Sequence, residues 1–400
     1  MIYFDYAATT PVSKKVFEEM NPYFSNFFGN ASSIYSIGCK ARLAVESSRK
    51  EIADLIGARK PSEIIFTSGA TEANNLAVKG VAFYASQVLK IKPHIIISSI
   101  EHHCVLNSAK YLENFFGFEV TYLPVNREGI IDLDFLKASI KNNTAIVSVM
   151  FGNNEMGAIQ PIAKIGEIVN EEKKKRKLSD NTLPIVFHTD AVQAFQYVDI
   201  DVNNFNIDML SLTAHKFYGP KGVGLLYVKD GVKFLSQQQG GSQEGGRRAG
   251  TENVPYIVGM AAAMREAVKN REKKAKEVSK LRGYLVDRLL KEIPKADLIG
   301  PKNLDERLPH IATFLFNSIE GESILLNLDM FDICASSGSA CTSGALESSH
   351  VTRSMGYSHM ESHGAIRFSL GDLSDMNDVD KLMLHLPRII EKLRAMSPIR

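Results

Sequence analysis

Short apolar segments alternate with helix-forming segments through the middle of this 400-residue chain, and this alternation limits its fold more than any other feature. Seven apolar runs have the length and β-branched content of strands, at 63–67, 94–99, 118–123, 145–151, 185–189, 208–213 and 223–228. Several are continuously apolar, which is typical of strands buried on both faces of a parallel sheet. Four helical stretches lie between them, at 71–85, 105–116, 133–140 and 162–177. The sequence therefore predicts a doubly wound α/β domain with a mostly parallel sheet.

The pattern changes after Thr251. A long helical stretch at 254–293 is followed by expected strands at 311–316 and 365–370 and by a closing helix at 379–395. We interpret this region as a smaller α+β domain. The expected division is a large domain over 15–260 and a small domain made of 1–14 with 261–400.

Composition excludes several classes of protein. Lys and Arg total 47 and Asp and Glu total 45, so the charge balance gives no reason to expect nucleic acid or a membrane surface as a partner. Four cysteines are too few for a disulfide scaffold, which favours a reducing compartment. The first residues lack the pattern of a signal peptide, and no apolar stretch reaches the ~18 residues of a membrane helix. We expect a cytoplasmic protein. The basic run 173–177 is interpreted as the solvated end of a helix rather than a contact patch.

The most informative segment is Ser211–Gly222, in which a strand is followed by a hydroxyl, a histidine and Lys216. A lysine at the end of a buried strand can form a Schiff base, because partial desolvation favours the neutral amine. Taken alone, Lys216 is better interpreted as a surface lysine at a strand–loop junction.

Two further segments favour the chemical interpretation. Asp190 and Gln193 follow another strand, and ligands of open parallel sheets bind at the carboxyl ends of the strands. An aspartate there can keep the ring nitrogen of pyridoxal 5'-phosphate protonated, so that the ring draws electrons from Cα. The segment Thr67–Glu72, between a strand and a helix, offers backbone N–H groups to a phosphate.

With these segments the chain resembles the class V aminotransferase family of fold-type I pyridoxal-phosphate enzymes, and most closely the NifS/IscS type of cysteine desulfurase. Nine motifs in the same order carry the resemblance: 5–11, 67–75, 101–102, 153–157, 190–193, 215–222, 250–253, 336–343 and 366–370. The run Ser336–Ser343 is the specific one, since it separates the desulfurases from other members.

The resemblance implies a role for each of twelve residues. Lys216 would be the Schiff-base lysine, Cys341 the thiol that takes the sulfur, and His102 the imidazole stacked on the cofactor ring. The remaining implied contacts to the cofactor are Asp190 at the ring nitrogen, Gln193 at the ring oxygen, Ala70, Thr71, Thr213 and His215 at the phosphate, and Thr251 at the phosphate of the other subunit. Asn154 and Arg367 would hold the substrate carboxylate, for which the planar guanidinium fork of arginine is suited. A site shared between subunits implies a homodimer.

Cysteine usage agrees with this interpretation. Cys341 lies in a run of Ser, Gly, Ala and Thr, where an exposed thiol has little structural use. Cys39 and Cys104 fall on expected helices and are interpreted as buried small hydrophobes, while Cys334 remains open. No Cys-x-x-Cys or His-Glu-x-x-His spacing exists, so we expect no metal. Dinucleotide and nucleoside-triphosphate fingerprints are missing as well.

The function implied is conversion of L-cysteine to L-alanine, with the sulfur kept as a persulfide on Cys341 and passed to an acceptor protein such as an iron–sulfur scaffold, or used for tRNA thiolation. The alternatives are a selenocysteine lyase or another class V enzyme, and a non-catalytic sulfur-transfer scaffold. The sequence does not identify the acceptor, choose between cysteine and selenocysteine, or explain the basic stretch 171–182. It also leaves open the effect of Ala31 and Tyr35, where the family commonly has proline and histidine.

Overall fold

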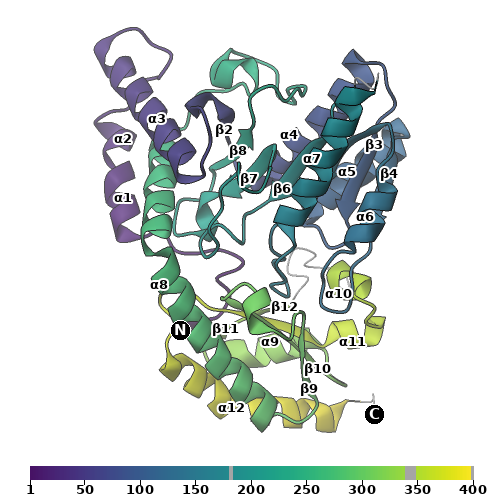
Figure 1. Ribbon diagram of the computed structural model, residues 1–400. Coiled ribbons are helices and arrows are strands. Elements are labelled where there is room, and N and C mark those ends of the chain that lie inside the picture. Colours follow the sequence, from purple (N-terminus) through teal and green to yellow (C-terminus); the bar gives the residue numbers. More distant parts are fainter. Residues whose placement is uncertain (180–182, 338–347, 398–400) are drawn as a thin grey trace.

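The computed structural model describes residues 1–179, 183–337 and 348–397 (Figure 1). Its central element is a seven-stranded sheet in the order β2-β8-β7-β6-β5-β3-β4. The strands are β2 (Ile64–Thr67), β3 (His94–Ser98), β4 (Glu119–Leu123), β5 (Thr144–Ser148), β6 (Val186–Asp190), β7 (Met209–Thr213) and β8 (Gly224–Val228). All seven expected strands are confirmed. β8 is antiparallel to both of its neighbours and the other pairs are parallel.

Helices cover both faces of this sheet, as the doubly wound prediction requires. α4 (Ala70–Phe83) and α5 (His103–Phe116) pack with Ile95 and Ile97 of β3 in one core. Ile96 of the same strand joins the core on the other face, which includes residues of α3 (Ser36–Leu55), α6 (Leu133–Ser139) and α7 (Ile162–Leu178). Alternate residues of a strand point to opposite faces, so continuously apolar strands serve two cores at once.

A second, smaller unit lies below the sheet in Figure 1. It contains a sheet in the order β12-β13-β10-β9, made of β9 (Ala296–Ile299), β10 (Ile311–Phe316), β12 (Ser336–Ser337) and β13 (Ala365–Ser369). α9 (Gly321–Asp329) and α12 (Met376–Met396) pack against it, and the short helices α10 (His350–Ser354) and α11 (His359–His363) follow. β1 (Ile2–Tyr3) pairs in parallel with β11 (Ile333–Cys334), so the chain start joins this unit.

The long helix α8 (Val254–Glu292) connects the two units. Its residues up to Ala267 belong to the core of the large sheet, and those from Val278 onward belong to the core of the small one. The expected boundary at residue 260 therefore falls inside a continuous helix, and the division at that position stays a prediction. α1 (Lys14–Met20), α2 (Pro22–Ser25) and α3 pack against α8. α1 and α2 were not anticipated from the sequence, whereas α3 contains Cys39, which was expected on a helix.

Two expectations about surface residues need correction. Arg176, inside the basic run at the end of α7, is buried and donates to the carbonyl oxygens of Lys141, Thr144 and Leu183. Only part of that run is solvated, because the guanidinium satisfies carbonyl groups that would otherwise be buried without partners. Cys39 on α3 is partly exposed rather than buried. Across the described ranges, no helix is long and apolar enough to span a bilayer.

Candidate active site

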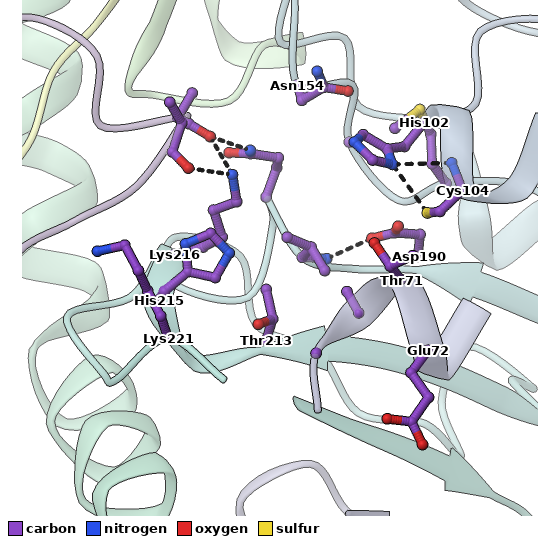
Figure 2. Close-up of a pocket in the computed structure, with 18 of the residues that line it drawn as sticks. Thr71, Glu72, His102, Cys104, Asn154, Asp190, Thr213, His215, Lys216 and Lys221 are labelled. Carbon is purple, nitrogen blue, oxygen red and sulfur yellow. Dashed lines mark hydrogen bonds between the residues drawn. The ribbon is translucent and has the colours of Figure 1, made fainter. Parts of the chain in front are cut away.

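A pocket of about 580 Å³ opens at the carboxyl ends of the strands of the large sheet. Ten of the twelve predicted site residues line it: Ala70, Thr71, His102, Asn154, Asp190, Gln193, Thr213, His215, Lys216 and Arg367. They come from both sheets and from the loops between them. Figure 2 shows Lys216 and His102 on opposite sides of the pocket, with Asp190 below His102.

One end of the pocket is rich in hydrogen-bond donors. α4 begins at Ala70, so the N–H groups of its first turn have no carbonyl of their own helix to bind. The N-cap is Gly69, and a Cβ built there would meet only Thr213 Oγ1, at 3.9 Å, within 4 Å. Thr71 and Thr213 add hydroxyl groups. This end therefore has the room and the donors for a phosphate.

His215 also lies at this end, where Nδ1 is 3.1 Å from Thr9 Oγ1. Burial, with nearby Lys216 and Lys221, lowers the pKa of His215 to about 4. His215 is therefore neutral near pH 7 and can donate one hydrogen bond. Lys216 and Lys221 also line the pocket.

Lys216 ends the short 3-10 helix η3 (Ala214–Lys216), directly after β7. Its Nζ donates to the carbonyl oxygens of Ala7 and Ala8, each at 2.7 Å. The segment that receives the lysine thus comes from the chain start, about two hundred residues away in sequence. These contacts hold the amine at the pocket wall.

Asp190 ends β6 and is 6% exposed. Its Oδ1 accepts from the N–H of Val192 at 3.0 Å, and its Oδ2 accepts from Asn74 Nδ2 at 2.6 Å. Both donors fix the orientation of the carboxylate. Asp190 can therefore present a fixed negative charge to a protonated ring nitrogen.

His102 is the N-cap of α5. Its Nδ1 accepts from the backbone N–H of Cys104 at 3.2 Å and lies 2.9 Å from Cys104 Sγ. Burial lowers the pKa of His102, an effect that Asp190 opposes and that Lys216 and His103 reinforce. The ring lies at the pocket wall opposite Lys216 (Figure 2).

Arg367 on β13 is 3% exposed and reaches the same pocket from the smaller unit. Its Nη1 donates to the carbonyl oxygen of Asn154 at 2.8 Å, and its Nη2 donates to Asp5 Oδ1 at 2.7 Å. Its Nε is buried and has no hydrogen-bond partner in the described ranges. One backbone carbonyl and one carboxylate hold the guanidinium in place, and further N–H groups, including that of Nε, can serve another acceptor.

Three further predicted residues are Gln193, Thr251 and Cys341. Gln193 donates through Nε2 to the carbonyl oxygen of Ala7 at 2.9 Å, and its Oε1 accepts from His310 Nε2 at 3.1 Å. Thr251 lies in the wall of an adjoining pocket of about 210 Å³ that shares Ser68 and Gly222 with the main one. Cys341 lies outside the described residues.

Sequence reasoning missed four contributors to this site: Asp5, Glu72, Asn74 and Cys104. Asp5, Glu72 and Asn74 stand inside motifs of the family resemblance, which was the available signal, but no role was assigned to them. Burial acts to raise the pKa of Glu72, but Arg248 and Ser68 hold it below its usual range; Arg248 forms a two-point ion pair with Glu72. Cys104 is buried in an apolar core as expected, and its thiol also contacts the polar side chains of Asn74 and His102.

Comparison with known proteins gives a consistent result. The family "Aminotransferase class-V" matches residues 2–382. A protein of Clostridium botulinum named cysteine desulfurase IscS is 47% identical over 398 residues, which cover 100% of this chain and 96% of that protein. A solved NifS-like protein has a TM-score of 0.88 at 36% identity, covering 98% of this chain and 100% of its own. A structure described as SspA in complex with cysteine has a TM-score of 0.78 at 38% identity, covering 93% and 99%.

The fold and the pocket define a fold-type I enzyme of the pyridoxal-phosphate class, and the chain belongs to the class-V aminotransferase family. Within that family it is similar over its whole length to the cysteine desulfurases. Members of this group use pyridoxal 5'-phosphate, and the donor set fits that cofactor. Donors without helical partners lie beside the open space at Gly69, an amine lies at Lys216, and a fixed carboxylate lies at Asp190.

Proposed function

We propose that this chain is a pyridoxal-phosphate-dependent cysteine desulfurase that converts L-cysteine to L-alanine and keeps the sulfur as a persulfide. The observation that carries the proposal is the convergence of Lys216, Asp190 and Arg367 on one pocket. An amine, a carboxylate and a guanidinium are the groups needed to bind an aldehyde cofactor and an amino-acid substrate together.

In this proposal each residue has a defined task. Lys216 would hold the cofactor through its aldehyde carbon, and its amine would take the proton from Cα of the substrate. Asp190 would keep the ring nitrogen protonated, and the donors at the N-terminus of α4 would bind the phosphate. The bound cofactor supplies an electron sink for the electrons left at Cα. Arg367 orients the substrate through its carboxylate.

Sulfur transfer is assigned to Cys341. Its thiolate attacks the substrate sulfur, a sulfur–sulfur bond forms, and the bond between the substrate sulfur and Cβ breaks. The electron pair of that bond stays on the carbon skeleton, which gains protons and leaves as alanine. One cysteine thus yields one alanine and one persulfide, with no external oxidant or reductant.

The direct test measures alanine and sulfur from L-cysteine with the purified protein loaded with cofactor. We expect alanine in amounts equal to the sulfur recovered as persulfide, or as sulfide once a thiol reductant is added. Alkylation of the persulfide followed by peptide mass analysis should locate it on the peptide that contains Cys341. A protein that binds the cofactor but forms no alanine from cysteine would overturn the proposal.

The persulfide requires an acceptor, and we propose a sulfur-acceptor protein such as an iron–sulfur scaffold. Iron–sulfur cluster assembly is the usual role of the desulfurases to which this chain is similar. A persulfide on a protein thiol suits such transfer, because the sulfur passes by attack of the acceptor thiolate without release as sulfide.

We also propose a homodimer in which Thr251 completes the phosphate site of the other subunit. Exposed apolar side chains are concentrated in residues 17–43. Phe28 is 70% exposed and Ile34 is 91% exposed, which is unusual for surfaces that remain in water. Thr251 itself is exposed beside the main pocket.

Sedimentation should give twice the 44.3 kDa mass of one chain. Ile34→Asp places a charge in the proposed interface. We expect it to raise the dissociation constant of the dimer about tenfold or more. Leu178→Asp is the matched control, because Leu178 is equally exposed at 91% but lies at the end of α7. A wild-type monomer with full turnover would contradict the shared site.

Replacing Arg367 by alanine is expected to raise KM for cysteine about tenfold to a hundredfold, because a charge-assisted contact to the substrate carboxylate is lost. The visible spectrum of the bound cofactor should stay unchanged, since Arg367 has no task in holding it. Arg367→Lys keeps the charge without the planar fork, so its KM for cysteine should lie between those of the wild type and Arg367→Ala. Loss of cofactor from Arg367→Ala would show that the arginine is structural.

A further inference from the structure

Four polar side chains form a continuous hydrogen-bonded row at the pocket wall: Asp190, Asn74, Cys104 and His102. Asn74 is fully buried on α4 and donates through Nδ2 to Asp190 Oδ2 at 2.6 Å and to Cys104 Sγ at 3.0 Å. Cys104 Sγ in turn lies 2.9 Å from His102 Nδ1. Asp190, Cys104 and His102, three members of the row, are labelled in Figure 2.

The direction of each hydrogen bond in the row follows from its two fixed ends. The carboxylate of Asp190 can only accept, so the amide NH₂ group of Asn74 must face it. The second N–H of Asn74 then points at the sulfur of Cys104, which accepts. The thiol proton is therefore free to point toward His102 Nδ1.

A second, independent contact also indicates that Nδ1 of His102 is a hydrogen-bond acceptor. The backbone N–H of Cys104 can only donate, and it lies 3.2 Å from Nδ1. Nδ1 must therefore be the unprotonated ring nitrogen, and neutral His102 carries its proton on Nε2. A thiolate at Cys104 would not fit this row, because burial and nearby Asp190 raise the pKa of that thiol.

We infer that Cys104 and Asn74 are positioning residues that hold His102 as the Nε2-protonated tautomer and connect it to the carboxylate of Asp190. The inference deepens the proposed function, on which the place of His102 beside the cofactor rests. Neutral His102 then offers a proton donor from Nε2 and has no acceptor lone pair there. Removal of the Cα proton is left to Lys216.

Other charged and titratable groups also act on the His102 ring. They are Asp190 on β6, Lys216 in η3, His103 on α5 and His350 on α10. Nδ1 contacts both Sγ and the backbone N–H of Cys104, so substitution of this side chain tests its contribution against theirs.

The test uses the full-length holoenzyme with ¹⁵N-labelled histidine, and nitrogen chemical shifts report the tautomer without any turnover. His102→Gln assigns the signal among the ten histidines. In the wild type we expect a protonated Nε2 and an unprotonated Nδ1. Cys104→Ala removes one donor from Nδ1 and should raise the pKa of His102 by about half a unit to one unit, because the neutral form loses a hydrogen bond.

Three matched variants sharpen the result. Cys104→Ser retains a donor and should keep the wild-type tautomer and pKa, while Cys39→Ala controls for loss of a thiol elsewhere. Asn74→Ala should shift the pKa in the same direction as Cys104→Ala, and the double variant should shift it by less than the sum, since both act through one thiol. A proton on Nδ1 in the wild type, or no difference between Cys104→Ala and Cys39→Ala, would overturn the inference. Failure of the proposed function appears separately, as missing alanine in the cysteine assay.

Discussion

Replacing Lys216 by alanine is expected to lower cysteine turnover at least about a thousandfold, because one side chain both binds the cofactor aldehyde and takes the Cα proton. Its amine lies 2.7 Å from the carbonyl oxygens of Ala7 and Ala8, at the pocket wall. The visible absorption of the holoenzyme should be lost or displaced. Some cofactor can still associate, since the donors at the N-terminus of α4 remain.

Lys221→Ala is the matched control for this experiment. Lys221 lines the same pocket and carries the same charge, but the proposal gives it no covalent task. Its turnover is expected to stay within about tenfold of the wild type. Alanine formation and cofactor absorbance should be measured for both variants. Retained turnover in Lys216→Ala would remove this lysine from the mechanism.

Replacing Cys341 by serine is expected to lower alanine release at least about a hundredfold while cysteine still binds. A hydroxyl is far less acidic and far less nucleophilic toward sulfur than a thiol, so no persulfide forms. Lys216, Asp190 and Arg367 are unchanged in this variant. The cofactor spectrum should therefore still respond to added cysteine.

This variant separates desulfuration from other chemistry on the same scaffold. An aminotransferase or a simple eliminating lyase has no need of the thiol and would keep most of its rate. Cys39→Ser, on α3 and outside the pocket, is the matched control and should behave as the wild type. If Cys341→Ser forms alanine from cysteine near the wild-type rate, the proposed mechanism is wrong.

Much of the large domain could be predicted from the sequence because its signals are local. Strand runs such as 94–99 and helices such as 162–177 are defined by the spacing of apolar residues within one segment, and all seven strands were found. The helices α1 and α2 were missed, and of α3 only a helix at Cys39 was expected. α1 has seven residues and α2 has four, and helices this short depend on packing against α8 more than on their own sequence.

Some features of the candidate site could likewise be predicted from the sequence, and others could not. The sequence located Lys216, Asp190 and Ala70 at the carboxyl ends of strands. Each lies at the end of a strand or within three residues of it, and parallel strands present their carboxyl ends together. The family resemblance added His102 and Arg367. Neither source indicated that Asp5 holds Arg367 or that Ala7 and Ala8 receive Lys216, because these contacts join segments more than two hundred residues apart.

The sequence by itself determined the class of fold, the family and the set of reactive groups, since these depend on local periodicity and on motifs of adjacent residues. Only the tertiary structure decided which partners orient those groups. Cys104 shows the difference: on an amphipathic helix its sequence position indicates a small buried residue, and it is buried. Its hydrogen bond to Asn74 arises only when α4 and α5 pack side by side, and sequence periodicity carries no information on that arrangement.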